Sequence, residues 1–348
     1  MAYYQSIRRD RKTYPLGNQA PGQAGWIAQR LLRLRAMLNG DIVSRRDPNS
    51  LIVGSWNIKH FDGGRKRLPE SYHYIAEIID HFDICAIQEA KDMEALRRLK
   101  GLLGPNWDFF VNDQTTGHAG NDERMAYFFN RNKVRFNNLI GELVYPRDEL
   151  LNGEQPSRTP FFASFQAGWF HFTLCSAHIV SEDKPGKPTR QQEIALIGKT
   201  LKERAEREDE VHIFMGDFNQ DDMDDAGLVD LKNMGYVIPD FGPTNLGTDK
   251  KHFDHITFIG PQDEGDLMES GRVDWHEAVY TDTDRDAYQQ IAAEIRDAPN
   301  TGIPYNNWSS FYSRWRTDEM SDHLPIWIEI RTDYSNRYLR AITELGNE

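Results

Sequence analysis

From residue 51 onward the chain alternates short apolar runs with segments of helical periodicity, and this alternation restricts its fold most. Eight runs have the length of strands and are rich in β-branched and aromatic residues. They cover residues 51–58, 84–88, 125–129, 161–165, 170–179, 211–215, 253–259 and 324–330. Gly168 lies between the fourth and fifth runs, where a hairpin would turn. Hairpins argue against a purely parallel sheet, so the sequence predicts a mixed α/β (α+β) fold.

Apolar residues at helical spacing predict helices between these runs. The expected helices cover residues 74–82, 93–103, 194–205 and 284–296, with at least one helical turn near residues 338–342. A further apolar series, residues 26–38, has arginines between its members. Such a helix either packs on the body of the protein or presents a basic surface to phosphates.

Charge is distributed unevenly along the chain. Residues 1–50 hold nine Arg or Lys and three Asp, a net charge of +6, whereas the whole chain carries −13, so the remainder carries −19. We therefore separate a basic N-terminal extension, 1–50, from a main domain, 51–332, with an insertion at about 260–320 and a tail, 333–348. An acidic body opposes long-range attraction to a polyanion. A site of metal-binding carboxylates is itself acidic, however, and its cation reverses the local sign.

The chain has two cysteines, Cys85 and Cys175, both inside apolar runs, which predicts buried thiols and excludes a disulfide framework. No apolar stretch reaches the length of a membrane span, and the first thirty residues lack the apolar run of a signal peptide. We therefore expect a cytoplasmic protein with no membrane partner.

Several of the apolar runs end abruptly in residues that bind metals or move protons. These residues are Asn57, Glu89, His178, Asp217 with Asn219, and Asp322 with His323, while Asp254 opens another run. Strand ends in packed sheets converge at one edge of the core, so scattered residues can meet there. Each has an ordinary alternative: a solvated strand end for Glu89, an Asx turn for Asp217, a cap for Asp322. Six coincidences in one chain make the ordinary alternative a poor account of the whole set.

The residue types suit one kind of chemistry. Carboxylates and side-chain amides are the hard oxygen ligands of Mg²⁺, Mn²⁺ or Ca²⁺. Histidines serve as general acid or base near neutral pH when a carboxylate fixes their tautomer. A zinc site is less favoured because no His or Cys pair has a close ligand spacing. The set predicts metal-assisted acid–base chemistry, with Mg²⁺ as the first choice of cation.

The ordered motifs resemble those of the endonuclease/exonuclease/phosphatase superfamily. They are Trp-Asn-Ile at 56–58, Ile-Gln-Glu at 87–89, Gly-Asp-Phe-Asn at 216–219, Phe-Asp-His-Ile at 253–256 and Ser-Asp-His-Leu-Pro at 321–325. Segments 122–129, 157–160 and 176–178 are most similar to the deoxyribonuclease I branch. The resemblance implies a four-layer sandwich of two mostly antiparallel sheets flanked by helices.

The same resemblance implies roles for individual residues. Glu123 would orient His178, and Asp254 would orient His323. Glu89 would hold the metal, with Asn57 and Asp322 close by. Asn219 and Arg158 would contact the phosphate, and Asp217 would hold a histidine, the attacking water or a second metal. One histidine would activate water and the other would protonate the leaving oxygen, with the assignment open.

The chain departs from the deoxyribonuclease I pattern at three points. Lys91 replaces an arginine, so it can meet a phosphate but not with two parallel hydrogen bonds. Asn121 replaces the tyrosine that stacks in the minor groove, and the disulfide of that branch is missing. We expect an endonuclease acting on DNA or other nucleic acid, ahead of a phosphatase or phosphodiesterase acting on a small molecule or lipid headgroup. A catalytically silent binding module is the third alternative.

Overall fold

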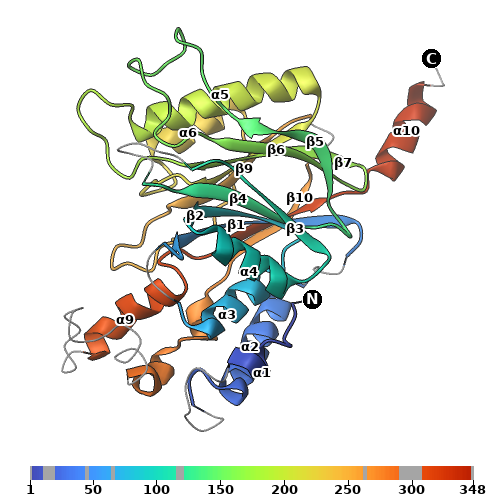
Figure 1. Cartoon of the computed structure of the whole chain (residues 1–348). Coiled ribbons are helices and arrows are strands. Elements are labelled where there is room, and N and C mark those ends of the chain that lie inside the picture. The colour runs from blue at the N-terminus through green and yellow to red at the C-terminus, as the bar shows by residue number, and fades with distance from the viewer. Residues whose placement is uncertain are drawn as a thin grey trace.

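The computed structural model describes residues 2–10, 20–43, 47–63, 67–114, 121–261, 265–289 and 308–345. Within them two β-sheets pack face to face, with helices on the outer side of each sheet (Figure 1). This arrangement confirms the predicted four-layer sandwich. No helix among the described residues is long and apolar enough to span a membrane.

Both sheets are mixed, as the sequence predicted. The first has the strand order β10-β11-β1-β2-β4-β3, with only β1 and β2 parallel. Its strands are β1 (Ser50–Phe61), β2 (Ile84–Ala90), β3 (Trp107–Val111), β4 (Arg124–Asn130), β10 (Leu267–Arg272) and β11 (Ile326–Arg331). The second has the order β5-β6-β7-β8-β9, with only β7 and β8 parallel. Its strands are β5 (Arg135–Glu142), β6 (Phe161–Ala167), β7 (Phe170–His178), β8 (Val211–Asp217) and β9 (Asp254–Ile259).

One of the core clusters lies between the two sheets. Val53 and Ile328 contribute to it from one sheet, and Phe172 and Met215 from the other. β1 is buried on both faces, because its alternate side chains join a second cluster beneath the helices. A strand that is buried on both sides is apolar throughout, which is why these runs were recognisable in the sequence.

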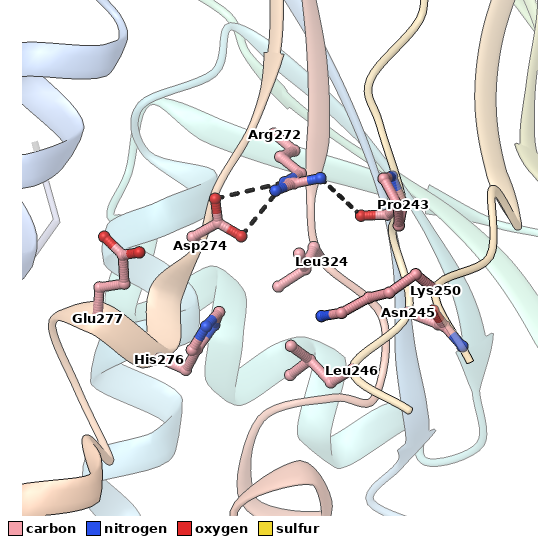
Figure 2. Close-up of a pocket in the computed structure, with 9 residues that line it drawn as sticks. All are labelled: Pro243, Asn245, Leu246, Lys250, Arg272, Asp274, His276, Glu277 and Leu324. Carbon is pink, nitrogen blue, oxygen red and sulfur yellow. Dashed lines mark hydrogen bonds and ion pairs between the residues drawn. The ribbon is translucent and has the colours of Figure 1, made fainter. Parts of the chain in front are cut away.

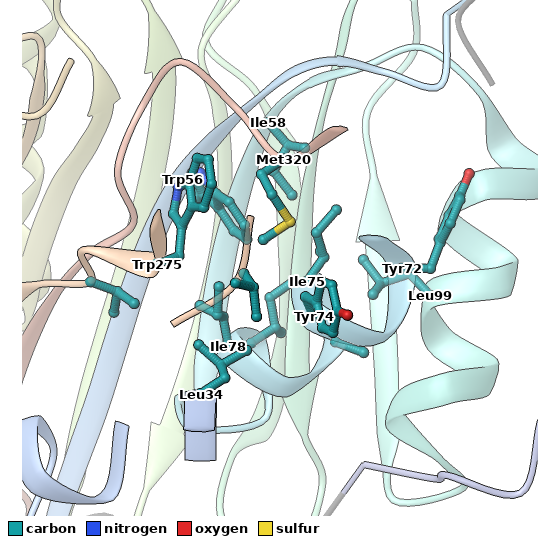
Figure 3. Packing of buried hydrophobic residues seen from close by; sticks show 14 of the residues in the cluster. Leu34, Trp56, Ile58, Tyr72, Tyr74, Ile75, Ile78, Leu99, Trp275 and Met320 are labelled. Atoms are coloured by element: carbon teal, nitrogen blue, oxygen red, sulfur yellow. The ribbon is translucent and has the colours of Figure 1, made fainter. Parts of the chain in front are cut away.

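Helices α3 (Pro69–Ile79) and α4 (Met93–Leu103) cover the six-stranded sheet, with α2 (Ala24–Asp41) packed outside α3 (Figure 1). Helices α5 (Arg190–Glu208) and α6 (Ala226–Met234) cover the five-stranded sheet. Leu34 of α2 packs beside Ile78 of α3 in the cluster around Trp56 (Figure 3). Of the two alternatives for residues 26–38, packing on the body is therefore confirmed. Consistent with packing, Arg30 forms an ion pair with Asp284.

The insertion before β11 is part of the folded body. It supplies the edge strand β10, two short 3₁₀ helices, η1 (Trp275–Glu277) and η2 (Asp282–Asp284), and helix α9 (Trp308–Glu319). Aromatic side chains of this segment pack together and reach α2, where Trp26 donates to the Tyr288 hydroxyl at 2.7 Å. The helix predicted over 284–296 lies partly outside the described residues.

The two ends of the chain differ in how they meet the body. The N-terminal segment includes the short helix α1 (Ile7–Asp10), and the Tyr3 amide donates to the Leu102 carbonyl at 2.6 Å. In the tail, the predicted helical turn is confirmed as α10 (Ser335–Leu345), which projects from the body (Figure 1). The predicted buried thiols, Cys85 and Cys175, are also confirmed.

Gly54 lets strand β1 lie close to the end of α3, and replacing it tests this packing. An added Cβ would lie 2.4 Å from the Phe82 ring, so we expect Gly54→Ala to reduce the free energy of unfolding by about 1–3 kcal/mol in urea titrations. Gly40→Ala in α2 is the matched control, because its Cβ would meet nothing within 4 Å. A Gly54→Ala protein as stable as the parent would contradict this account.

Candidate active site

Strands of both sheets bring the predicted residues to one edge of the sandwich. His178, Asp217 and Asp254 lie side by side in register across β7, β8 and β9. Opposite them, Asn57 of β1 donates to Asp217 Oδ2 at 2.9 Å, which joins the two sheets at this point. The site therefore depends on how the sheets pack as well as on the strands themselves.

His323 is held by a buried carboxylate. Its Nδ1 lies 2.8 Å from Asp254 Oδ2, and the Thr244 hydroxyl donates to the same oxygen at 2.7 Å. Burial alone would lower the pKa of His323, but the negative charges of Asp254 and Asp217 raise it well above its usual value. The site thus favours the imidazolium form of His323.

His178 faces a different carboxylate. Its Nδ1 lies 3.1 Å from Glu123 Oε2, although the ring is not aligned for a regular hydrogen bond. Arg158 Nε donates to the same oxygen at 2.9 Å. Burial alone would raise the pKa of Glu123, but His178 and Arg158 bring it below its usual value, so the carboxylate is ionised.

The two residues that depart from the deoxyribonuclease I pattern both approach Glu123. Asn121 donates through Nδ2 to Glu123 Oε1 at 2.6 Å, and Lys91 Nζ lies 3.9 Å from the same oxygen. Lys91 and Arg158 therefore place two positive charges beside one carboxylate. Such a surplus of positive charge is suited to a phosphate.

Asp217 lies between the two histidines. Its Oδ2 is 3.5 Å from His178 Nε2 and 3.7 Å from His323 Nε2. Burial raises the pKa of Asp217, although the two histidines oppose that shift. Of the roles expected for Asp217, this geometry suits the holding of a histidine, and it extends that role to both.

Asn219 is held at the end of β8 by hydrogen bonds of its backbone and its side chain. Its backbone N–H donates to Asp217 Oδ1 at 3.0 Å, and its side-chain Nδ2 donates to the Ile179 carbonyl at 2.9 Å. Its backbone carbonyl accepts a hydrogen bond from Arg190 Nη1 at 2.6 Å, a contact that sequence reasoning missed. Asn219 therefore braces the end of β8, and its predicted contact with a phosphate stays a prediction.

Glu89 occupies the end of β2, with a left-handed φ of 59°. Its Oε1 accepts from Asn57 Nδ2 at 3.2 Å, and its Oε2 accepts from the His60 amide at 2.8 Å. Burial alone would raise the pKa of Glu89, but His60 and His178 lower it below the usual range. Glu89 is therefore a carboxylate at any pH at which the protein would work.

The surroundings of Glu89 fit a divalent cation. Within the described part of the chain, Asn57 Oδ1 is buried and has no hydrogen-bond partner. An unsatisfied buried amide oxygen beside an ionised carboxylate is a donor set that hard cations prefer. His60 also contacts Glu89, with its Nδ1 3.1 Å from Oε2. The sequence did not point to His60, because residues three apart in a regular strand point to opposite faces and His60 follows Asn57 by three residues.

Asp322 is not drawn into the contacts around Glu89. Its Oδ2 lies 3.3 Å from Lys59 Nζ, and 44% of its side chain is exposed. Lys59 also pairs with Asp318 at 3.3 Å, so it links β1 to the last turn of α9 and to the segment that follows that helix. Nothing in the sequence motifs pointed to Lys59. The predicted role of Asp322 as a metal ligand stays a prediction.

A pocket of about 380 Å³ adjoins the His323 side of the site (Figure 2). Leu246 and Leu324 line it, and Arg272 is held by Asp274 and the Pro243 carbonyl. Its charged side chains balance, because Lys250 and Arg272 face Asp274 and Glu277. The pocket therefore gives no net attraction to a second phosphate.

Comparisons with known proteins identify the family of this chain. The model of the endonuclease/exonuclease/phosphatase family matches residues 54–323. A deoxyribonuclease from Thioalkalivibrio sp. (strain K90mix) is 26% identical over 215 residues, which are 59% of this chain and 56% of that protein. The chain thus spans about half the length of the curated relative it matches.

Solved structures share the fold. An endonuclease/exonuclease/phosphatase family protein from Bacteroides thetaiotaomicron is similar over 82% of this chain and 98% of its own, with a TM-score of 0.54 and 19% identity. A mannosyl-6-phosphatase from Bacteroides thetaiotaomicron VPI-5482 is similar over 80% of this chain and 99% of its own, with a TM-score of 0.52 and 18% identity. D. rerio TDP2 complexed with a single-strand DNA product is similar over 81% of this chain and 99% of its own, with a TM-score of 0.51 and 14% identity. Because the family model covers well over half of the sequence, this chain belongs to the endonuclease/exonuclease/phosphatase family, whose members are hydrolases that act on phosphate esters.

Proposed function

We propose that the protein is a metal-dependent endonuclease that hydrolyses phosphodiester bonds in DNA or another nucleic acid. The observation that carries this proposal is the pair of histidines around Asp217. The Nε2 atoms of His178 and His323 lie 3.5 and 3.7 Å from the same oxygen, while each Nδ1 faces its own carboxylate. Two braced imidazoles that face one point suit a reaction that needs both a proton acceptor and a proton donor.

In this mechanism one imidazole accepts a proton from the attacking water through Nε2. The new P–O bond forms as the bond to the leaving oxygen breaks, and the other imidazole donates its proton to that oxygen. Asp217 stabilises whichever ring carries the positive charge, and Glu123 and Asp254 keep the rings oriented. The products are a phosphate monoester and an alcohol, and proton exchange with solvent restores both histidines.

Positive charge around the phosphate comes from side chains of this chain and from the cation. Arg158 and Lys91 flank Glu123, with 13% and 17% of their side chains exposed, so both are within reach of a bound substrate. Glu89 and Asn57 would hold the divalent cation, for which Mg²⁺ is the first choice and Mn²⁺ or Ca²⁺ the alternatives. When bound, this cation neutralises charge on a nonbridging phosphate oxygen.

The similarity to a deoxyribonuclease and to TDP2 with a DNA product supports a nucleic-acid substrate. We expect supercoiled plasmid to be nicked in the presence of Mg²⁺ and to stay intact with a chelator. A closed circle has no ends, so nicking also separates endonuclease from exonuclease action. Single-stranded DNA, RNA and a small phosphodiester are run in parallel. Release of phosphate from small esters, with every nucleic acid left intact, would instead identify a small-molecule phosphatase.

A further inference from the structure

We propose that His60 provides a nitrogen ligand at the cation site of Glu89, so that this site binds Co²⁺ more tightly, relative to Mg²⁺, than a site of oxygen ligands alone would. The inference rests on the proposed function, because it concerns the cation site that the proposed reaction uses. Oxygen ligands alone suit Mg²⁺, Ca²⁺ and Mn²⁺, whereas an imidazole favours the later transition ions. His60 would therefore change the metal preference of the site.

The position of the imidazole supports this role. His60 Nδ1 lies 3.1 Å from Glu89 Oε2, and the ligand atoms of His60, Glu89 and Glu123 lie within 4.8 Å of one another. Although 43% of the His60 side chain is exposed, its Nδ1 is buried and has no hydrogen-bond partner in the described residues. Ligands about 2.0–2.3 Å from one metal ion lie at most about 4.6 Å apart, so the spacing between Nδ1 and Oε2 allows a shared cation.

The backbone explains how His60 reaches Glu89. In a regular strand, residues three apart point to opposite faces, so Asn57 and His60 would not serve one site. The register of β1 against β2 shifts between Asn57 and Phe61, and His60 has a left-handed φ of 45°. Bulges of this kind re-aim side chains and are frequent beside active sites. Here the bulge turns His60 toward the carboxylate that Asn57 also contacts.

A purely electrostatic role for His60 makes the opposite prediction. If His60 only donates a hydrogen bond to Glu89 Oε2, the imidazole competes with any cation for that oxygen. Its removal would then strengthen the binding of every divalent ion in the same proportion. If His60 is a ligand, its removal weakens the binding of Co²⁺ far more than that of Mg²⁺ or Mn²⁺. The two roles therefore predict changes of opposite sign in the affinity for Co²⁺ when His60 is removed.

The test is isothermal titration calorimetry of Mg²⁺, Mn²⁺ and Co²⁺ with the parent and His60→Asn proteins. Asparagine tolerates a left-handed φ and keeps the backbone amide that donates to Glu89, so the variant replaces the imidazole nitrogen by an amide oxygen, which suits Mg²⁺ better than Co²⁺. We expect the affinity for Co²⁺ to fall at least about tenfold, and that for Mg²⁺ to stay within about threefold. His60→Asp, which replaces nitrogen by a charged oxygen ligand, should raise the affinity for Mg²⁺ relative to Co²⁺. Equal melting temperatures without metal show that both variants fold.

His171→Asn is the matched control, because His171 lies on β7 seven residues from His178, roughly 23 Å along the strand. It should leave all three affinities unchanged, and it accounts for ions that bind surface histidines. A His60→Asn protein with the selectivity of the parent would overturn the ligand role of His60 alone. A parent that binds none of the ions would overturn both this inference and the metal dependence of the proposed function.

Discussion

Replacing either His178 or His323 by alanine is expected to lower turnover at least about a hundredfold, the usual contribution of a positioned acid or base. Both rings face Asp217, so they form one proton-transfer unit. The double variant should therefore lose much less than the product of the two single losses. Single-turnover rates of nicking of supercoiled plasmid, measured for the parent and the three variants, test this non-additivity.

Variants of the bracing carboxylates extend this test. Glu123→Gln and Asp254→Asn should cause intermediate losses, because each frees a ring that the structure holds at Nδ1. His212→Ala is the matched control, since His212 is a fully buried histidine five residues from Asp217 on β8. Burial lowers the pKa of His212 to about 4, so it is neutral, and its removal should reduce stability with little effect on chemistry. If activity falls only in variants whose melting temperature also falls, the histidines are structural and the proton-transfer proposal fails.

Glu89→Gln is expected to reduce kcat/KM by about 10²- to 10³-fold or more, because it removes the charge that holds the cation. The melting temperature without metal should change little. Glutamine is isosteric with glutamate, and its carbonyl oxygen can still accept the hydrogen bond from the His60 amide. Metal titrations of the same variant should show weakened binding of Mg²⁺.

A second buried glutamate provides the control for this substitution. Burial raises the pKa of Glu70 in α3 to about 7, and this carboxyl accepts hydrogen bonds from the Gly22 amide and from Tyr288. Glu70→Gln should leave activity within about twofold of the parent. Activity of Glu89→Gln within about tenfold of the parent would show that Glu89 is an ordinary strand end.

Secondary structure was predictable where a segment is buried on both sides or carries a strong apolar period. β1, β2 and β8 were recognised because almost every residue in them is buried. The edge strand β5 was missed because most of its side chains are exposed, and the edge strand β10 carries polar residues in its second half. Trp315 of α9 contacts Tyr288, which in turn contacts Trp26 of α2, and no local pattern predicts such contacts between segments distant in sequence.

The sequence by itself determined which residues could form the site, because apolar strands that end in carboxylates and histidines are a local pattern. It also determined the family, through motifs in a fixed order. Only the tertiary structure decided which atoms meet. Asp217 meets His178 across the neighbouring strands β7 and β8, and it meets His323 because the face-to-face packing of the two sheets brings the segment before β11 to it. Asp322, in the same segment, pairs with Lys59 instead. His60 reaches Glu89 only because a bulge breaks the two-residue alternation of β1, and a bulge depends on the register of two strands that no local pattern encodes.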